Sequence, residues 1–269
     1  MTFAARRLRI GFAAILLALV VLFGHAVYAA TLGDARFLSG YMLLALVVFL
    51  ALYGLRRRVP FLPLGSSARW LQAHILTGGL GVVVFAVHVD WTVPRGVFEI
   101  ALAIAFLVVA GSGVIGLFLS RYLPARLSSR GEDLLFDRIP VIRREILERA
   151  EALVMEATTK AQTSTIADYY SDRLRAFFDR PCNFWSHIVE SGRPRRRILA
   201  EMTDLDRYLD REERRVLGEI RGLVVAKDDT DYQHALQSVL RYWTFAHVPM
   251  TNALLLLLLV HVVAVHAFA

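Results

Sequence analysis

Residues 74–88 read HILTGGLGVVVFAVH, an apolar run that begins and ends on histidine. It lies within a longer apolar block, approximately Leu71–Val89, that contains no lysine, arginine or glutamate. A helix of about 20 residues crosses the roughly 30 Å hydrocarbon core of a bilayer. Because the block is continuously apolar and does not alternate, it predicts a transmembrane helix and not a strand of a barrel.

Four further blocks of the same kind flank this one. They run approximately Ile10–Ala30, Phe37–Leu55, Val97–Leu119 and Phe245–Ala269. The chain of 269 residues is 56% hydrophobic, whereas a soluble domain is about 45–50% apolar. The sequence therefore predicts an all-α integral membrane protein with five transmembrane helices, and it excludes an ordinary soluble protein and a disordered chain.

The first block has a second interpretation. Arg6, Arg7 and Arg9 precede it and Val27-Tyr28-Ala29 lies near its end, which is typical of a secretory signal peptide. The apolar run is longer than the 7–15 residues or so of such a signal. We therefore expect the block to be retained as the first span, and cleavage would leave four spans with the same orientation.

The distribution of arginines among the loops predicts the orientation of the spans. They precede the first span, separate the second from the third and follow the fourth: Arg6, Arg7, Arg9, Arg56, Arg57, Arg58, Arg69, Arg121, Arg126 and Arg130. The opposite loops hold only Arg36 and Arg95. The positive-inside rule then predicts a cytoplasmic N-terminus and an outer C-terminus in a bacterial-type inner membrane. The third and fifth spans run parallel in this arrangement.

The polar segment 121–243 divides the spans into residues 1–120, with helices one to four, and residues 244–269, with helix five. This segment is predicted to lie on the cytoplasmic side, and the spacing of its apolar residues predicts a helical insertion. We expect helices around Ile142–Val154, over Ala167–Phe178 with Ser164 or Thr165 as the N-cap, over Arg196–Tyr208, from Asp210 to Val225, and from about Asp231 into the fifth span.

Six of the eight histidines fall within the predicted spans, where an ionisable side chain is by default a functional candidate. His74 and His88 are fourteen residues apart on the third span, and His247 and His261 are fourteen apart on the fifth. Fourteen residues of helix rise about 21 Å and end about 40° from the starting face. Each helix therefore offers two imidazoles on one side, and the two helices offer them at matching depths.

Two facing imidazoles at one depth can ligate a haem iron from both sides. His74 and His247 are the predicted ligands of the cytoplasmic-side iron, and His88 and His261 those of the outer-side iron. Filling both axial positions leaves no open site for oxygen, which favours electron transfer over oxygen chemistry.

Small and cationic residues around these histidines are further candidates for contact with a haem. Gly78 and Gly81 lie between His74 and His88, and Arg69 and Arg241 lie near the cytoplasmic boundary, where haem propionates need cations. Gly111, Gly113, Gly116, Trp70, Trp243, Arg95 and Trp91 are secondary candidates of the same two kinds. The alternative is that the glycines serve helix packing and that the boundary residues anchor the helices.

The other histidines and the cysteine carry less information. His25 and His266 lie near the predicted outer surface, and His266 is an alternative to His261 as a ligand or a candidate for quinone or proton chemistry. His187 and His234 lie in the polar segment and are expected to be surface residues. The single cysteine, Cys182, excludes disulfides and cysteine-held iron–sulfur clusters.

These histidine pairs resemble those of the transmembrane part of the ferric reductase and NADPH oxidase family, in which two haems lie between the third and fifth spans. His74 and His88 match that family's first pair, and His247 and His261 match the second. The pattern is also similar, less closely, to cytochrome b of the bc complexes. The resemblance covers only the membrane spans, and it implies two haem b groups that carry electrons across the membrane.

Three differences from these families matter. No GxGxxG motif follows a predicted strand, and no flavin or nicotinamide domain is expected after His266, so hydride chemistry requires a partner. The Pro-Glu-Trp-Tyr motif of bc-type cytochromes is absent, and the insertion 121–243 fits neither family. The insertion is predicted to dock a redox partner or sister subunit, or else to brace two spans. The expected partners are membrane lipid, that redox protein and a quinone, with no nucleic acid.

Two other classes of function remain open at this stage. A histidine-lined transporter for a transition metal would need carboxylates or methionines along its path, and Glu99 is nearly the only acid within the spans. A membrane anchor or scaffold subunit would leave the repeated histidine spacing without a role.

Overall fold

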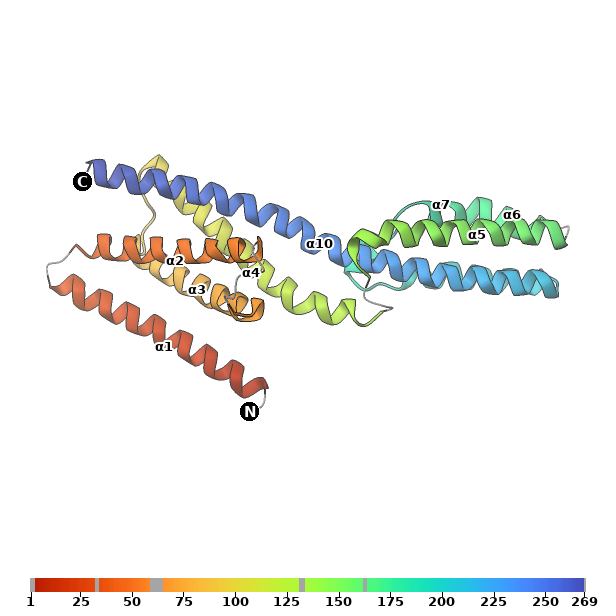
Figure 1. Cartoon of the computed structure of the whole chain (residues 1–269), viewed down its shortest axis with the longest axis horizontal. Coiled ribbons are helices and arrows are strands. Elements are labelled where there is room, and N and C mark those ends of the chain that lie inside the picture. The colour runs from red at the N-terminus through yellow and green to blue at the C-terminus, as the bar shows by residue number, and fades with distance from the viewer. Residues whose placement is uncertain (1–2, 32–33, 59–64, 131–133, 162–163, 269) are drawn as a thin grey trace. The chain divides into compact units, whose positions relative to one another are not determined.

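The computed structural model describes residues 3–31, 34–58, 65–130, 134–161 and 164–268, and these residues form helices and connecting loops without a strand (Figure 1). The chain divides into two compact units. The apolar unit comprises Met1–Phe118 and Trp243–Ala269, and the polar unit comprises Leu119–Tyr242. Each unit is described separately.

The apolar unit is built from α1 (Phe3–Ala30), α2 (Ala35–Arg58), α3 (Ser67–His88), the first part of α4 (Val97–Leu127) and the last part of α10 (Arg211–Phe268). All five helices contain a stretch long and apolar enough to cross a membrane, as the sequence predicts. Helices α2 and α3 pack against each other, and α1 contacts both.

Apolar side chains cover much of the outside of this unit. Phe12 and Phe23 on α1 are 69% and 72% exposed, and Leu256 on α10 is 67% exposed. Helices with apolar residues all round are typical of buried or lipid-embedded segments. The unit therefore has the character of a membrane protein, whereas the type of membrane and the side of each terminus stay predictions.

An apolar core holds the middle of the unit together. Its buried members come from α2, α3, α4 and α10 and are Leu43, Val47, Val84, Phe106 and Leu254. Phe85 stacks on Phe106 with ring centroids 4.3 Å apart. Leu254 lies midway between His247 and His261 in the sequence, so this core separates the two histidine levels.

The polar unit has an apolar core of its own. Helix α5 (Ile139–Ala161) buries Ile146, Ala150, Leu153 and Val154, the face that its apolar spacing predicts. The first half of α10 packs against the same cluster through Val216, Leu217, Ile220 and Val224. Met202 on α9 (Arg193–Leu205) completes it and is fully buried.

The short elements of this unit differ from the predicted ones in detail. The predicted helix Ala167–Phe178 is a stretch of α6 (Thr165–Tyr169), a π segment (Tyr170–Leu174) and α7 (Arg175–Asp179). Ser164 is its N-cap residue but makes no capping hydrogen bond. Helix α8 (Phe184–Ile188) was not predicted, and α9 begins at Arg193 because Pro194 suits the first turn.

Helix α10 corrects the prediction of two helices separated near residues 226–230. It is continuous from Arg211 to Phe268. Lys227 pairs with Asp231 one turn later, and Thr230 Oγ1 donates to the carbonyl of Ala226, so two contacts within the helix engage polar residues of this stretch. At its start, the Asp210 and Glu213 side chains each accept from the other's backbone N–H, at 2.8 and 3.0 Å, in a capping box.

Candidate functional site

His88 and His261 come together in the apolar unit, although 173 residues separate them in the chain. Their ring centroids lie 6.5 Å apart, with the ring planes at 89°. Both line a pocket of about 1110 Å³ whose other walls come from α2, α4 and the segment between α3 and α4. Phe98 stacks on His261 at 6.3 Å. The pocket is large and mostly apolar, with two imidazoles on its wall.

Ser39 on α2 holds the His88 ring in position. Its hydroxyl lies 3.2 Å from His88 Nδ1 and 3.0 Å from the carbonyl oxygens of Ala35 and Arg36. Because the hydroxyl proton goes to a carbonyl, Ser39 Oγ accepts from Nδ1–H. This arrangement leaves the Nε2 lone pair of His88 available to a metal.

Gly40 provides the space for the same ring. A Cβ atom added at Gly40 would lie 3.1 Å from Cε1 of His88, which is tighter than an ordinary carbon contact. The sequence analysis missed both Ser39 and Gly40. A Ser-Gly pair inside the second apolar block was the available signal, but nothing in the sequence says which histidine it faces.

At the other level, His74 and His247 are near enough to interact electrostatically. His74 is partly buried, and its Nδ1 is a buried atom with no hydrogen-bond partner among the described residues. The ring of Tyr53 lies 5.0 Å from that of His74.

His247 has its own serine partner on a different helix. Its Nδ1 hydrogen-bonds the Ser112 hydroxyl on α4, which parallels the contact between His88 and Ser39. Trp243 stacks on the His247 ring at 5.1 Å and donates from Nε1 to the Ser112 carbonyl at 2.8 Å. Two of the four candidate ligands are therefore oriented through Nδ1 by a serine.

The glycines on α3 differ in their surroundings from Gly116. Gly78 and Gly81 lie four and seven residues after His74, on the same face of α3. Gly81 is buried, yet a Cβ there would meet no atom within 4 Å, and one at Gly78 would meet only a Leu50 methyl at 3.9 Å. At Gly116 a Cβ would collide with the Trp243 indole. Gly116 therefore makes room for Trp243.

We expect Gly116→Ala to destabilise the apolar unit by about 1–3 kcal/mol, because overpacking forces the Trp243 ring out of place. Gly113→Ala is the matched control on the same helix, since its Cβ would meet nothing within 4 Å. Thermal melting of the two purified variants in the same detergent compares them. An equal or higher melting temperature for Gly116→Ala would show that the indole does not depend on this glycine.

The predicted cationic residues lie in different settings. Arg95 lines the pocket of His88 and His261, and so does Arg36, which pairs with Asp90 at 2.7 Å. Arg69 is exposed in the first turn of α3. Arg241 belongs to the polar unit, pairs with Asp137 at 3.2 Å and covers the ring of Phe136 at 3.9 Å.

The remaining secondary candidates are two tryptophans and two glycines. Trp70 stacks on Phe49 with ring centroids 5.7 Å apart, and Trp91 is 75% exposed. Gly111 and Gly113 have no atom within 4 Å of an added Cβ.

His266 has partners for both ring nitrogens. Its Nδ1 lies 2.7 Å from the Val262 carbonyl and therefore donates, so Nε2 accepts from the Tyr41 hydroxyl at 2.6 Å. This favours His261 over His266 as the histidine that acts with His88. His25 Nε2 hydrogen-bonds the Ala35 carbonyl at 3.2 Å, which links α1 to the start of α2.

His187 corrects the expectation of a surface histidine. It is only 4% exposed, and its Nε2 lies 3.8 Å from Asp228. Tyr232 packs edge-on against its ring at 5.9 Å. The sequence places His187 among polar residues, but it does not reveal that α8 directs this side chain into the interior of the polar unit. His234 is partly buried and stacks on Phe136.

Asp228 is a buried acid in the polar half of α10, outside the apolar stretch that starts at Phe245. Burial raises its pKa to about 6, and the repulsion from Asp229 and Asp231 acts in the same direction, against the attraction of Arg195 and Arg130. The folded protein therefore holds this proton more tightly than the unfolded chain does. The contribution of Asp228 to the free energy of unfolding therefore falls as the pH rises from about 4 to about 6.

We expect Asp228→Asn to remove this pH dependence. The free energy of unfolding of the variant, relative to the unaltered protein, should rise by on the order of 2–3 kcal/mol between pH 4 and pH 7. Denaturant titrations at pH 4, 5.5 and 7 measure it. Burial lowers the pKa of His187, which acts in the opposite direction below pH 6.5. A difference that is flat with pH would contradict the assignment.

The donor set at each histidine pair is limited to two imidazole nitrogens among the described residues. Among the described residues, no group of three or more His, Cys, Asp or Glu side chains is placed to hold a metal ion. Each histidine pair supplies two nitrogen ligands, which is the number that a haem iron takes from a protein when both axial positions are filled.

Comparison of the chain with family models, with curated proteins and with solved structures found no match.

Proposed function

We propose that this chain is a dihaem b-type cytochrome that carries electrons across a bacterial-type inner membrane. His88 and His261 would hold the haem iron nearer the predicted outer side, and His74 and His247 the iron nearer the cytoplasm. A haem with two imidazole ligands exchanges one electron at a time between its ferric and ferrous states.

The observation that carries the proposal is the separation of His88 and His261. Imidazole nitrogens bind a metal at about 2 Å, so two rings that ligate one metal from opposite sides have centroids about 6 Å apart. The distance of 6.5 Å between the two ring centroids agrees with this value. The adjoining pocket of about 1110 Å³ supports the same interpretation.

The orientation of the rings adds to this support. Ser39 and Ser112 bind Nδ1 of His88 and of His247, and a hydrogen bond at one imidazole nitrogen typically fixes the tautomer of a ligating histidine. Between the two levels, Phe85 and Phe106 stack within the apolar core. That core excludes water and keeps the two candidate sites apart.

Electron exchange at the outer side is proposed to involve a quinone or a protein partner. Tyr41 and His266, linked by a 2.6 Å hydrogen bond, line the same pocket as His88 and offer groups that can bind a carbonyl or pass a proton. At the other side we propose that the polar unit docks the redox partner.

An absorption spectrum of the purified full chain tests the proposal. We expect reduced b-type bands and about two haems per chain, as bis-histidine ligation of each haem requires. Metal analysis of the same sample separates the alternative, because a transition-metal transporter would contain zinc or copper without haem. A colourless protein, correctly folded and expressed with sufficient haem supply, would overturn the proposal.

A further inference from the structure

Tyr41 on α2 and His266 near the end of α10 form a hydrogen-bonded pair in the pocket that contains His88 and His261. The iron proposed for that pocket does not need them, because His88 and His261 supply both axial nitrogens. The pocket has a volume of about 1110 Å³, which exceeds the roughly 300–1,000 Å³ of a typical site for one small ligand. The pair therefore lines a space in which a second molecule can lie beside the proposed haem.

The hydrogen bonds of His266 fix the direction in which the proton of this pair points. Nδ1 of His266 lies 2.7 Å from the carbonyl oxygen of Val262, so it carries a proton and donates. In a neutral imidazole the other nitrogen is then an acceptor. Nε2 therefore receives the hydroxyl proton of Tyr41 across 2.6 Å, and the Tyr41 oxygen keeps only its lone pairs for a ligand. This arrangement recognises a hydroxyl donor, and a carbonyl could bind only if the bond to His266 broke first.

Both side chains are accessible, and their surroundings are apolar and aromatic. Tyr41 is 52% exposed, and His266 is exposed as well. Phe37, one turn before Tyr41 on α2, packs edge-on against the His266 ring with the ring centroids 6.4 Å apart. Leu44 and Val265 continue the apolar wall of the pocket. A ligand for this place thus needs an apolar body, a ring that packs on aromatic side chains, and a hydroxyl group that donates.

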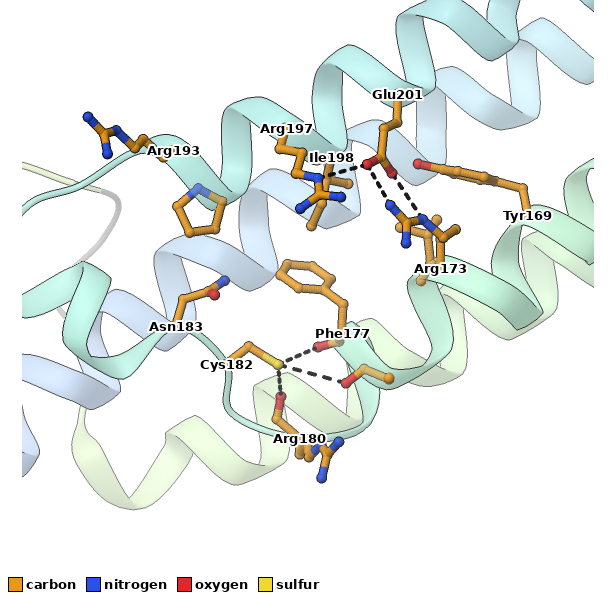
Figure 2. Close-up of a pocket in the computed structure, with 13 residues that line it drawn as sticks. Tyr169, Arg173, Phe177, Arg180, Cys182, Asn183, Arg193, Arg197, Ile198 and Glu201 are labelled. Carbon is orange, nitrogen blue, oxygen red and sulfur yellow. Dashed lines mark hydrogen bonds and ion pairs between the residues drawn. The ribbon is translucent and has the colours of Figure 1, made fainter.

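Charged side chains in the pocket of the polar unit engage one another instead. That pocket has a volume of about 670 Å³ and lies between the π segment and α9 (Figure 2). Arg173 donates to Glu201 from Nε and Nη2, and Arg197 also donates to Glu201, so a carboxylate of the protein itself engages these cations. The pair of Tyr41 and His266 differs, because the tyrosine oxygen has lone pairs left for a ligand.

We propose that Tyr41 and His266 bind a quinol, the reduced form of a membrane quinone, and accept its protons while its electrons enter the haems. This inference rests on the proposed function, which supplies the electron acceptor. A quinol combines an apolar aromatic ring with hydroxyl donors, and it dissolves in the apolar phase in which the spans are predicted to lie. Tyr41 follows Gly40, which lies against the His88 ring, so the quinol would lie near a ligand of the outer iron.

The reaction balances in atoms and electrons. One quinol and two ferric irons give one quinone, two ferrous irons and two protons. For each electron, an O–H bond of the quinol breaks as its proton passes to the Tyr41 oxygen, while the Tyr41 proton passes to Nε2 of His266. His266 becomes a cation and, because it is exposed, releases a proton to water before the second transfer. An imidazole titrates near neutral pH, which suits it to accept and release a proton in turn.

Equilibrium binding of decylubiquinol and decylubiquinone to the full chain in detergent micelles tests the preference for the reduced form, with protein-free micelles as the background. We expect the quinol to bind about tenfold more tightly than the quinone, the effect of one hydrogen bond. Tyr41→Phe should remove this difference by weakening quinol binding. His266→Ala should remove it in the opposite way, because Tyr41 can then donate to a carbonyl and quinone binding should rise. Tyr28→Phe is the matched control, because it removes an exposed tyrosine hydroxyl outside the pocket.

Binding of the quinol does not require haem, so the preference is also measured on protein purified without haem. In haem-loaded protein, decylubiquinol should produce the reduced b-type bands, and it should do so more slowly in Tyr41→Phe and His266→Ala. Equal binding of quinol and quinone, unchanged in both variants, would overturn this inference and leave the haem content, and thus the proposed function, intact. Haem that stays oxidised with quinol bound would overturn the pair as an entry point for electrons.

Discussion

Replacing His88 with alanine is expected to remove one of the two haems that we propose, and replacing His261 is expected to do the same. The two rings lie 6.5 Å apart and would serve one iron, so loss of either ligand opens the same site. The haem content of the purified protein should fall by about half in each variant, since two axial ligands hold each iron. Pyridine haemochrome analysis against protein concentration measures the change.

The double variant His88→Ala/His261→Ala sharpens this experiment. Because both residues would bind the same haem, it should lose no more haem than either single variant. His88→Ala/His247→Ala should instead lose both haems, because those residues belong to different levels. His266→Ala serves as the control, since both of its ring nitrogens already have partners. Equal losses from the two double variants would contradict the pairing by level.

The largest expected effect on stability comes from Lys227→Ala in the polar unit. The side chains of Lys227 and Asp231 are 0% and 1% exposed, and their charged atoms lie 2.5 Å apart. The ammonium group also donates to the Arg180 carbonyl at 2.8 Å and covers the ring of Phe177. Removing it leaves a buried carboxylate without its cation, which costs about 3–5 kcal/mol. Denaturant unfolding of the full chain measures this loss.

The double variant Lys227→Met/Asp231→Leu separates the charge from the packing. Replacing both partners of a buried ion pair with apolar residues of similar size is often neutral or stabilising. We therefore expect the double variant to recover most of the stability lost in Lys227→Ala. Arg215→Ala breaks exposed ion pairs on the same helix and should change the melting temperature little. Similar losses in all three variants would contradict the role of the buried pair.

The sequence predicted the spans well because membrane helices have a simple physical signature. A continuous apolar run of about 20 residues is sufficient to indicate one. The fourteen-residue spacing of the histidines likewise needs only helix geometry, and His88 and His261 lie close together in the structure. Properties that depend on one helix and its period are therefore accessible from sequence.

Contacts between helices were not accessible in this way. Ser39, Gly40 and Ser112 acquire their roles only when α2 and α4 are placed beside a particular histidine. A serine in an apolar helix commonly bonds its own backbone, so its presence indicates no partner. The burial of His187 depends on tertiary packing in the same way.

The hydroxyl partners of His88 and His247 bear on the reduction potentials of the proposed haems. A carboxylate that accepts from Nδ1–H makes an imidazole a stronger electron donor, and this favours ferric iron. A serine oxygen is a weaker acceptor, so the iron proposed beside His88 should be reduced more readily than with aspartate in place of Ser39. Ser39 would thus affect the driving force for electron entry without touching the iron.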